Sequence, residues 1–331
     1  MREEPERICE GGEKKGLSII LVSFNTKELT LRCLENLFRE GLPQGTEVLV
    51  VDNGSEDGTF EAIGNEFPEV RVFHSEVNLG FARAVNLALS HSRGSYALLL
   101  NTDCFPQKGS IERLLLFMER NPGVGIAGGA LLHPDGRPQN CFGRAPTLAT
   151  ELLPRGLLEI TFPSRYPSKR RPPLGPVSVE SVVGAFLMVR RDAWEQVGLM
   201  DEGFFLFLEE TDWCLRMRKA GWHVYHVPEA KAVHIQGQSM RTNLKAARIE
   251  FYRSRYRFFL IHRGKGQLAL LFVGLLIKGF VNWIWSAILS WVPGRNTDRW
   301  RERHRVDGRI LAWHLMGCPR GWGLCPAEGE S

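Results

Sequence analysis

The chain has 331 residues, of which 44% are hydrophobic and 24% are charged, and its net charge at pH 7 is +5. This composition excludes a disordered or fibrous protein, and the length suffices for one large or two modest domains with a substantial core. The modest positive charge favours partners that carry phosphate, or an anionic membrane surface, and does not by itself indicate nucleic acid.

The cysteines and the N-terminus bear on the compartment. Seven cysteines occur, and none stands in a CxxC or another metal-ligand spacing, so we expect reduced thiols in a cytoplasmic protein. Residues 1–16 are rich in charge and lack the apolar core of a signal peptide. We therefore expect a flexible N-terminus and a body that stays where it is synthesised.

Residues 17–103 alternate between apolar strand patterns and amphipathic helix patterns. Asn25 with Glu28 three positions later predicts a capping box at the start of the first helix. Uninterrupted Val, Ile and Leu strands joined by helices predict an α/β fold, with a mostly parallel sheet and helices on both faces. The strand patterns are LSIILVSF (17–24), EVLVVDN (47–53), VRVFHS (70–75) and YALLLNTD (96–103).

Polar residues follow the predicted strands at the points where the strands end. In α/β sheets ligands bind beyond the carboxyl ends of the strands, so these side chains are expected on one rim. No GxGxxG follows the first strand and no GxxxxGK[ST] occurs, so a nucleotide would be held by side chains rather than by a glycine-rich loop. For residues 52–55 an ordinary Asx turn is the alternative. The polar residues are Ser23, Asn25, Asp52, Asn53, Asn78, Asn101 and Asp103.

The middle of the chain changes character twice. Residues 134–178 are rich in Pro, Gly and Arg with weak periodicity, which predicts a long loop of the kind that is often functional. Residues 181–198 return to a strand followed by a helix. Residues 223–239 alternate in the manner of a strand, and the alternation ends at His234.

An acidic cluster follows the apolar run FFLFL at residues 204–208. We expect this run to form a buried strand that fixes Glu209 and Glu210 at the mouth of a helix over 211–220, where Asp212 can pair with Arg216. A carboxylate at a helix N-terminus is favoured as the anion and suits the role of general base. The alternatives are a solvated capping cluster for the acids and a core position for Trp213.

Residues 268–292 form the most apolar stretch, interrupted by Lys278 and Asn282 and flanked by basic residues. A bilayer span needs about 20 apolar residues, and a central Lys costs about 2.5 to 3.5 kcal/mol on insertion scales. The tryptophans and basic flanks favour a helix in the membrane interface or a pair of half-buried helices. A helical hairpin packed on the protein's own core is the alternative.

Six stretches coincide in kind, order and spacing with one family. They resemble the family 2 glycosyltransferases of GT-A fold, and most of all the rhamnosyltransferase-type members that build bacterial surface polysaccharides. The resemblance covers roughly residues 17–260. It suggests a GT-A domain over residues 17–262, preceded by the N-terminus at 1–16. The remaining residues, 263–331, would form a C-terminal helical segment that associates with a membrane or packs on the domain. The stretches are VSFN (22–25), VVDNGSEDGT (50–59), NLGFARAVN (78–86), LLLNTDC (98–104), the run from Gly184 to Trp222, and VHIQGQS (233–239).

The resemblance implies an inverting transfer of a sugar from a nucleoside-diphosphate sugar, with dTDP-rhamnose as one candidate, aided by Mg²⁺ or Mn²⁺. The acceptor would be a hydroxyl of a saccharide or lipid-linked saccharide at the cytoplasmic face of the membrane. Asn101 stands where many relatives have the first Asp of an Asp-x-Asp motif. The implied roles are donor binding for Ser23, Asn25, Asp52, Asn78, Gly80, Asn86 and Asp103, metal binding for Asp103 and His234, the catalytic base for Glu209 or, as the close second choice, Glu210, and acceptor binding for Glu210, Asp212 and Trp213.

Three other functions stay open on the sequence. The first is a nucleotide-sugar-binding protein without turnover, against which the retained Asp103, Glu209, Glu210 and His234 argue. The second is a nucleotidyltransferase, which should carry a glycine-rich and basic loop where this chain has SFNTKE (23–28). The third is a membrane-anchored interaction protein, which leaves the polar strand ends unexplained.

Overall fold

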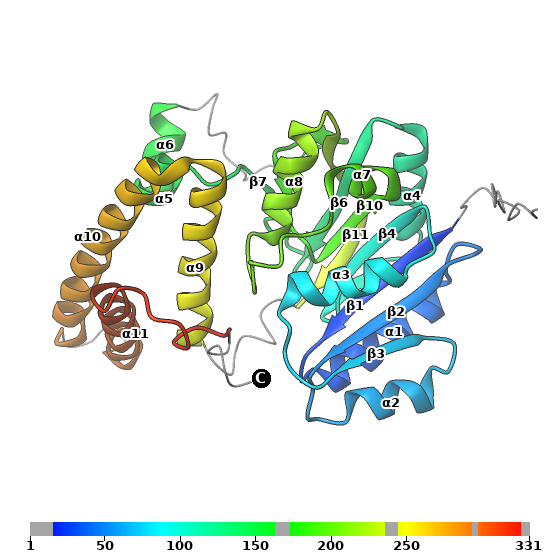
Figure 1. Ribbon diagram of the computed structural model, residues 1–331, viewed down its shortest axis with the longest axis horizontal. Helices are drawn as coiled ribbons and strands as arrows, with labels where there is room; N and C mark the ends of the chain where they lie inside the picture. The colour runs from blue at the N-terminus through cyan, green and yellow to red at the C-terminus, as the bar shows by residue number, and fades with distance from the viewer. Residues whose placement is uncertain (1–15, 163–172, 236–243, 293–296, 326–331) are drawn as a thin grey trace, which may run out of the picture.

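The computed structural model describes residues 16–162, 173–235, 244–292 and 297–325. Its centre is a mixed sheet in the order β3-β2-β1-β4-β10-β6-β11-β5, with β8 paired to β11 (Figure 1). Strands β3, β2, β1 and β4 are parallel, β10 runs antiparallel to β4 and β6, and β11 is parallel to β6. The strands are β1 (Leu17–Ser23), β2 (Glu47–Asn53), β3 (Arg71–Ser75), β4 (Tyr96–Asn101), β5 (Cys104–Pro106), β6 (Val124–Leu132), β8 (Val177–Ser178), β10 (Phe186–Arg190) and β11 (His223–His234).

Helices cover both faces of the sheet, so the predicted α/β class is confirmed. Each face has its own apolar core, because alternate residues of every strand point to opposite sides. Cys33, Cys104 and Cys214 are buried in these cores as free thiols. One face carries α1 (Lys27–Glu40), α2 (Thr59–Glu66) and α4 (Ser110–Arg120), and the other carries α3 (Phe81–His91), α7 (Arg191–Val197) and α8 (Glu209–Lys219).

The predicted capping box at Asn25 is wrong. Helix α1 has Thr26 as its N-cap, without a side-chain capping bond. Asn25 instead has a φ of 50°, and its side-chain oxygen accepts a hydrogen bond from the Glu56 N–H at 2.8 Å. Its own N–H donates to the Ser55 hydroxyl at 3.0 Å. Tertiary contact between two loops therefore takes the side chain that local spacing assigned to the helix.

The predicted buried strand at 204–208 is also wrong. These residues form an irregular segment in which only Phe204 is buried, and Phe207 and Leu208 have φ values of 74° and 67°. Two consecutive left-handed residues turn the chain sharply, at a cost of about 1 to 3 kcal/mol each, which the surrounding contacts must offset. Helix α8 consequently begins at Glu209, two residues before the predicted start.

Part of the predicted long loop at 134–178 is ordered into short elements. It contains β7 (Phe142–Gly143), which pairs with β9 (Ser181–Val182), and the helices α5 (Leu148–Leu152) and α6 (Arg155–Thr161). Thr147 and Thr150 form a capping box at the start of α5, a local signal that the composition of the loop obscured. Residues 163–172 lie outside the described residues, as do residues 1–15 and 236–239 of the predicted segments.

Three long helices follow the sheet domain: α9 (Leu244–His262), α10 (Gly264–Ser290) and α11 (Thr297–Leu315). They form a layer beside the sheet domain, with α5 packed against α10 (Figure 1). Within the described residues α10 is the one helix long and apolar enough to cross a membrane, with a mean hydropathy of 1.9. It buries Leu271, Leu275 and Leu289 against its neighbours and leaves its other face exposed.

Candidate active site

The ends of β1, β2 and β3 bring predicted donor residues together. The sheet register places Ser23 beside Asp52, and Asp52 beside His74. Ser23 and Asp52 are both fully buried. The Ser23 hydroxyl is hydrogen-bonded to Thr26 and Thr30 at 3.1 and 2.9 Å. The expected convergence of strand ends is present, but these two side chains form the floor of the site rather than its surface.

His74 is a member of this rim that we did not predict. Its Nδ1 lies 3.0 Å from Asp52 Oδ2, and the other oxygen of Asp52 accepts the Ser55 N–H at 3.3 Å. The His74 side chain is 41% exposed and its ring lies 5.1 Å from that of Phe60. Asp52 therefore orients a ring that a ligand can reach. His74 ends the strand pattern VRVFHS, so the same strand-end argument could have found it.

Asn53, Asn78 and Gly80 shape the next loop. Asn53 donates to Asn78 Oδ1 at 3.0 Å and accepts the Leu79 N–H at 2.9 Å, and Asn78 Oδ1 also accepts the Gly80 N–H. Gly80 has a φ of 81°, and a Cβ there would lie 2.6 Å from the carbonyl oxygen of Phe205. Only glycine fits, and the close approach joins the predicted donor loop to the segment that precedes Glu209.

Asn86 serves the structure rather than the donor. It is 6% exposed, its amide nitrogen donates to the Met200 carbonyl at 2.9 Å, and its oxygen accepts the Met200 N–H at 3.0 Å. Both ends of the amide are thus used to hold residue 200 against α3. The predicted contact of Asn86 with the donor is corrected for that reason.

Asp103 and His234 meet, as the resemblance implied. Strand β5 pairs antiparallel with β11, which places Cys104 opposite His234 and brings His234 Nε2 to 3.2 Å from Asp103 Oδ1. Two adjacent ligands of an octahedral Mg²⁺ or Mn²⁺, with bonds of about 2.1 Å, lie about 3.0 Å apart. The spacing of the pair therefore fits two ligands of one such ion. Asn101 contributes its backbone N–H to the Ala185 carbonyl at 3.1 Å.

No group of three or more His, Cys, Asp and Glu side chains that could hold a metal occurs among the described residues. An ion at Asp103 and His234 would take its other ligands from water and phosphate oxygens, which is how Mg²⁺ is commonly bound in sites that handle nucleotides. Among the described residues, those that would bind such an ion are thus one carboxylate and one imidazole.

Glu209 and Glu210 open α8 and differ in their surroundings. Glu209 is 5% exposed, whereas Glu210 is partly exposed, and its side chain lies against Gly184. The carbonyl of the next residue, Ala185, accepts the Asn101 N–H at 3.1 Å, so the Glu210 side chain lies near the end of β4, two residues before Asp103. One oxygen of each acid, Oε2, is buried without a hydrogen-bond partner.

The two carboxyl groups have raised pKa values for related reasons. Burial raises the pKa of Glu209 well above its ordinary value, and the charge of Glu210 and, to a smaller extent, that of Glu250 on α9 raise it further. Burial likewise raises the pKa of Glu210. Because the two groups repel as anions, ionisation of one disfavours ionisation of the other.

Asp212 and Trp213 do not belong to an acceptor site. Asp212 is buried between Arg216 at 2.7 Å, the pairing predicted from spacing, and His262 Nε2 at 2.6 Å. Trp213 is fully buried, and its indole N–H donates to the Gly198 carbonyl at 2.9 Å. Both predicted acceptor roles are corrected: the carboxylate is bonded to Arg216 and His262, and the indole lies in the core, which was the alternative for Trp213.

Helix α9 supports the acidic segment from the outside. Arg257 binds the Asp201 carboxylate at 2.6 Å, Ser254 donates to the Leu206 carbonyl at 2.7 Å, and His262 meets Asp212. Three positions along one helix therefore hold the turn that begins α8. The sequence could not reveal this, because the partners are about 50 residues apart.

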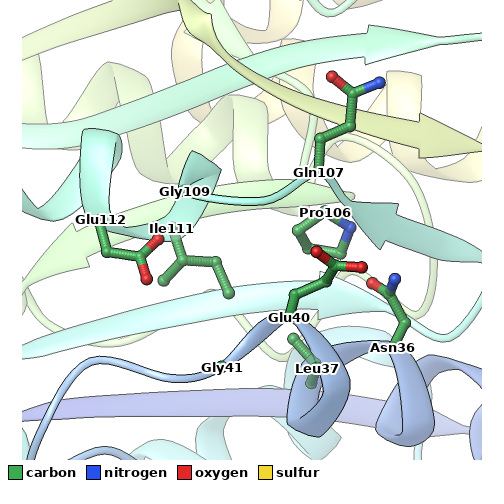
Figure 2. A pocket seen from close by; sticks show the side chains of 9 residues that line it. All are labelled: Asn36, Leu37, Glu40, Gly41, Pro106, Gln107, Gly109, Ile111 and Glu112. Atoms are coloured by element: carbon green, nitrogen blue, oxygen red, sulfur yellow. The ribbon is translucent and has the colours of Figure 1, made fainter.

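A small hollow lies between α1, α4 and the end of β5 (Figure 2). It is lined by Asn36, Glu40, Pro106 and Glu112, among others, and none of the candidate donor, metal or acid residues contributes to it. Two of its lining residues, Glu40 and Glu112, carry carboxylates, which do not suit an anionic ligand. We do not assign it to the active site.

The fold and the site define an α/β protein that gathers polar side chains at one sheet edge, around a pair formed by a carboxylate and an imidazole and beside an acidic helix start. The model of glycosyl transferase family 2 matches residues 18–198, more than half of the chain, and the chain belongs to this family. It is a glycosyltransferase by family, with the GT-A fold.

Relatives and solved structures agree with this placement. The chain is 29% identical over 238 residues to an N-acetylglucosaminyl-diphospho-decaprenol L-rhamnosyltransferase of Mycobacterium tuberculosis, covering 66% of this chain and 76% of that protein. It is 24% identical to the dTDP-rhamnosyl transferase RfbF of Shigella flexneri, covering 76% of this chain and 81% of that protein. Among solved structures, the chain is similar to GalNAc-T7 with UDP, GalNAc and Mn²⁺. The TM-score is 0.55 at 14% identity, over 91% of this chain and 56% of that one.

A mannosyltransferase from Pyrobaculum calidifontis, in complex with GDP-Man and Mn²⁺, has a TM-score of 0.51 at 14% identity and covers 91% of this chain and 86% of that one. At such identities the likeness shows the fold alone. The family match and the two rhamnosyltransferase relatives support a role in sugar transfer.

Proposed function

We propose that the chain is an inverting, metal-dependent glycosyltransferase that moves a sugar, with rhamnose from dTDP-rhamnose as the first candidate, to a saccharide hydroxyl in surface polysaccharide synthesis. The observation that carries the proposal is the common location of the Asp103 and His234 pair and of Glu210 at the end of β4. The names of the mycobacterial and Shigella relatives support the donor and a lipid-diphosphate acceptor.

Glu210 is the catalytic base in this proposal, with Glu209 as its protonated neighbour. This reverses the order expected from the sequence. Glu210 is the more exposed of the two and lies against Gly184, near the end of β4, whereas Glu209 is almost fully buried. Two carboxyl groups with separated protonation states are a common way to hold one base ready.

The reaction follows from this placement. The acceptor hydroxyl lies between Glu210 and the anomeric carbon, and Glu210 takes its proton as the hydroxyl oxygen forms the new bond on the face opposite the diphosphate. The bond from the anomeric carbon to the diphosphate breaks, which inverts the configuration. A divalent cation held by Asp103 and His234 would supply charge neutralisation for the departing diphosphate.

The donor's nucleoside lies over β1 to β3 in this proposal. The ring of His74, oriented by Asp52, is the one that the nucleobase can reach. Asn53 and Asn78 fix the backbone turn at Gly80, which borders the sugar. Ser23 and Asn25 act beneath or beside this pocket, because their polar groups are bonded to protein partners.

In this proposal the C-terminal helices bind an anionic membrane surface, which would bring the enzyme to a lipid-linked acceptor. The exposed apolar residues of α10 recur every three or four positions and therefore form one face, and Lys278 is held by the Glu151 carbonyl at 2.8 Å. Basic residues of α11, which packs along α10, suit anionic headgroups. The face consists of Leu270, Val273, Ile277, Phe280, Val281, Ile284, Trp285, Ile288 and Trp291.

A panel of nucleoside-diphosphate sugars with Mn²⁺, scored for slow donor hydrolysis without acceptor, tests the transfer. We expect one donor to be hydrolysed, the Glu210→Gln variant to lose transfer, and Glu119→Gln, an exposed residue of α4, to behave as the native chain. Binding of nucleotide without any hydrolysis or transfer would instead support a partner protein without turnover.

Flotation with vesicles that contain anionic lipid tests the membrane surface. The double variant Ile277→Asp with Trp285→Asp should stay with the soluble fraction, while Leu116→Asp, at a similarly exposed apolar position of α4, should float like the native chain. A native chain that does not float would refute this part of the proposal and leave the chemistry untouched.

A further inference from the structure

The turn after β6 carries a glutamine that reaches the predicted metal site. Gln139 lies in a hairpin-like return in which its N–H donates to the Leu131 carbonyl at 2.8 Å and the His133 N–H donates to the Arg137 carbonyl at 2.8 Å. Its backbone is thus fixed to the strand. From this position its side-chain amide lies against His234, 95 residues away in the sequence.

The surroundings of the Gln139 amide determine which way it points. Its nitrogen donates to the His234 carbonyl and lies 3.3 Å from the Leu132 carbonyl and 3.2 Å from His133 Nδ1. Carbonyl oxygens only accept hydrogen bonds, so the amide nitrogen, not the oxygen, must face them. The amide oxygen Oε1 is consequently the atom that lies 2.9 Å from His234 Nδ1.

The position of Oε1 decides which nitrogen of His234 carries the hydrogen. Because an amide oxygen only accepts, Nδ1 is the donor of this bond. In the neutral ring the second nitrogen, Nε2, then turns its lone pair toward Asp103 Oδ1 at 3.2 Å. Two acceptor atoms that face each other at this distance are suited to share a cation.

We propose that Gln139 is a positioning residue for the cation site, setting both the ring orientation and the Nδ1–H tautomer of His234 so that Nε2 is free to bind a divalent ion beside Asp103. This inference rests on the metal site of the proposed function. The turn after β6 thereby holds the His234 ring in place for the active site. Gln139 itself touches neither the ion nor the substrate.

Gln139→Leu keeps the bulk of the side chain and removes both of its hydrogen bonds to His234. Loss of an outer partner of a metal-bound histidine commonly weakens metal affinity about 10- to 100-fold. We expect a loss of that size for Mn²⁺ alone, measured by electron paramagnetic resonance on the full-length chain. Asp135→Ala, at an exposed position of the same turn, is the matched control and should bind as the native chain does.

A second readout separates positioning from a general structural effect. In the chain labelled with ¹⁵N-histidine and without metal, the nitrogen signals of His234 should show the Nδ1–H tautomer, and Gln139→Leu should shift them toward a mixture. Gln139→Glu keeps an acceptor for Nδ1–H, so it should retain the tautomer even where it weakens the turn, and it serves if the Leu variant does not fold.

The outcomes are distinguishable. Native binding of Mn²⁺ that is lost in His234→Ala and unchanged in Gln139→Leu overturns the inference and leaves the proposed metal site intact. Absence of any difference between the native chain and His234→Ala overturns both. Loss in Gln139→Leu together with the tautomer shift, and no change in Asp135→Ala, supports the inference.

Discussion

Replacing Glu210 by Gln should make the enzyme slower and the fold more stable at the same time. Glu210 has a buried oxygen without a hydrogen-bond partner, and burial raises the pKa of its carboxyl group. A buried polar atom left unsatisfied costs about 1 to 3 kcal/mol, and more when it is charged. Gln keeps a polar atom in that position and removes the charge, so the expected gain comes from the lost charge. Removal of a general base costs about 10²- to 10⁴-fold in rate.

The stability change has a defined dependence on pH. A carboxyl group whose pKa is higher in the folded than in the unfolded state binds more protons when folded, so stability falls as pH rises from the unfolded to the folded pKa. The native chain should therefore be relatively less stable at pH 8 than at pH 5. The gain of Glu210→Gln should be largest at pH 8 and vanish toward pH 4.

Urea denaturation at pH 5, 6.5 and 8, beside transfer rates for the same preparations, measures both effects. Glu119→Gln is the control for the loss of a surface carboxylate. Glu209→Gln mimics the protonated form of its residue, so we expect it to lose less than tenfold in rate. A Glu210→Gln variant that keeps its full rate, or that is less stable than the native chain at pH 8, would refute the assignment.

Three further substitutions test the support of the site. Gly80→Ala would bring a Cβ to 2.6 Å from the Phe205 carbonyl at a φ of 81°, so we expect a higher KM for the donor and a lower melting temperature. Gly41→Ala, at the end of α1, also has a positive φ but meets no neighbour, so it should lose stability without changing KM. His262→Ala removes a buried hydrogen bond to the Asp212 carboxylate and should cost about 1.5 to 3 kcal/mol in urea denaturation, and an unchanged midpoint would show that the contact contributes nothing. Trp213→Phe loses the bond to the Gly198 carbonyl and should cost about 1 kcal/mol with an unchanged KM for the acceptor, whereas a raised KM would restore the stacking role that its burial contradicts.

The strands, the class of fold and the ordered motifs could be predicted because they rest on local pattern. The run 47–53 is a strand as predicted, and β11 ends at His234, since apolar periodicity and strand ends are properties of neighbouring residues. The meeting of Asp103 with His234 followed from the family's motifs. The failures at Asn25 and at 204–208 share one cause, because each segment is fixed by partners far away in the chain.

The sequence by itself determined which side chains could do chemistry: the strand-end polar residues, the two acids at 209 and 210, and the apolar stretch near the C-terminus. Only the tertiary structure decided which of them face a ligand. Buried contacts within the protein occupy the polar groups of Asn86, Asp212 and Trp213. Strand pairing brings His74 to the rim, and a turn brings Gln139 to His234. The physical reason is that a polar group in a folded chain must satisfy its hydrogen bonds, and its partners are supplied by distant segments that no local pattern reveals.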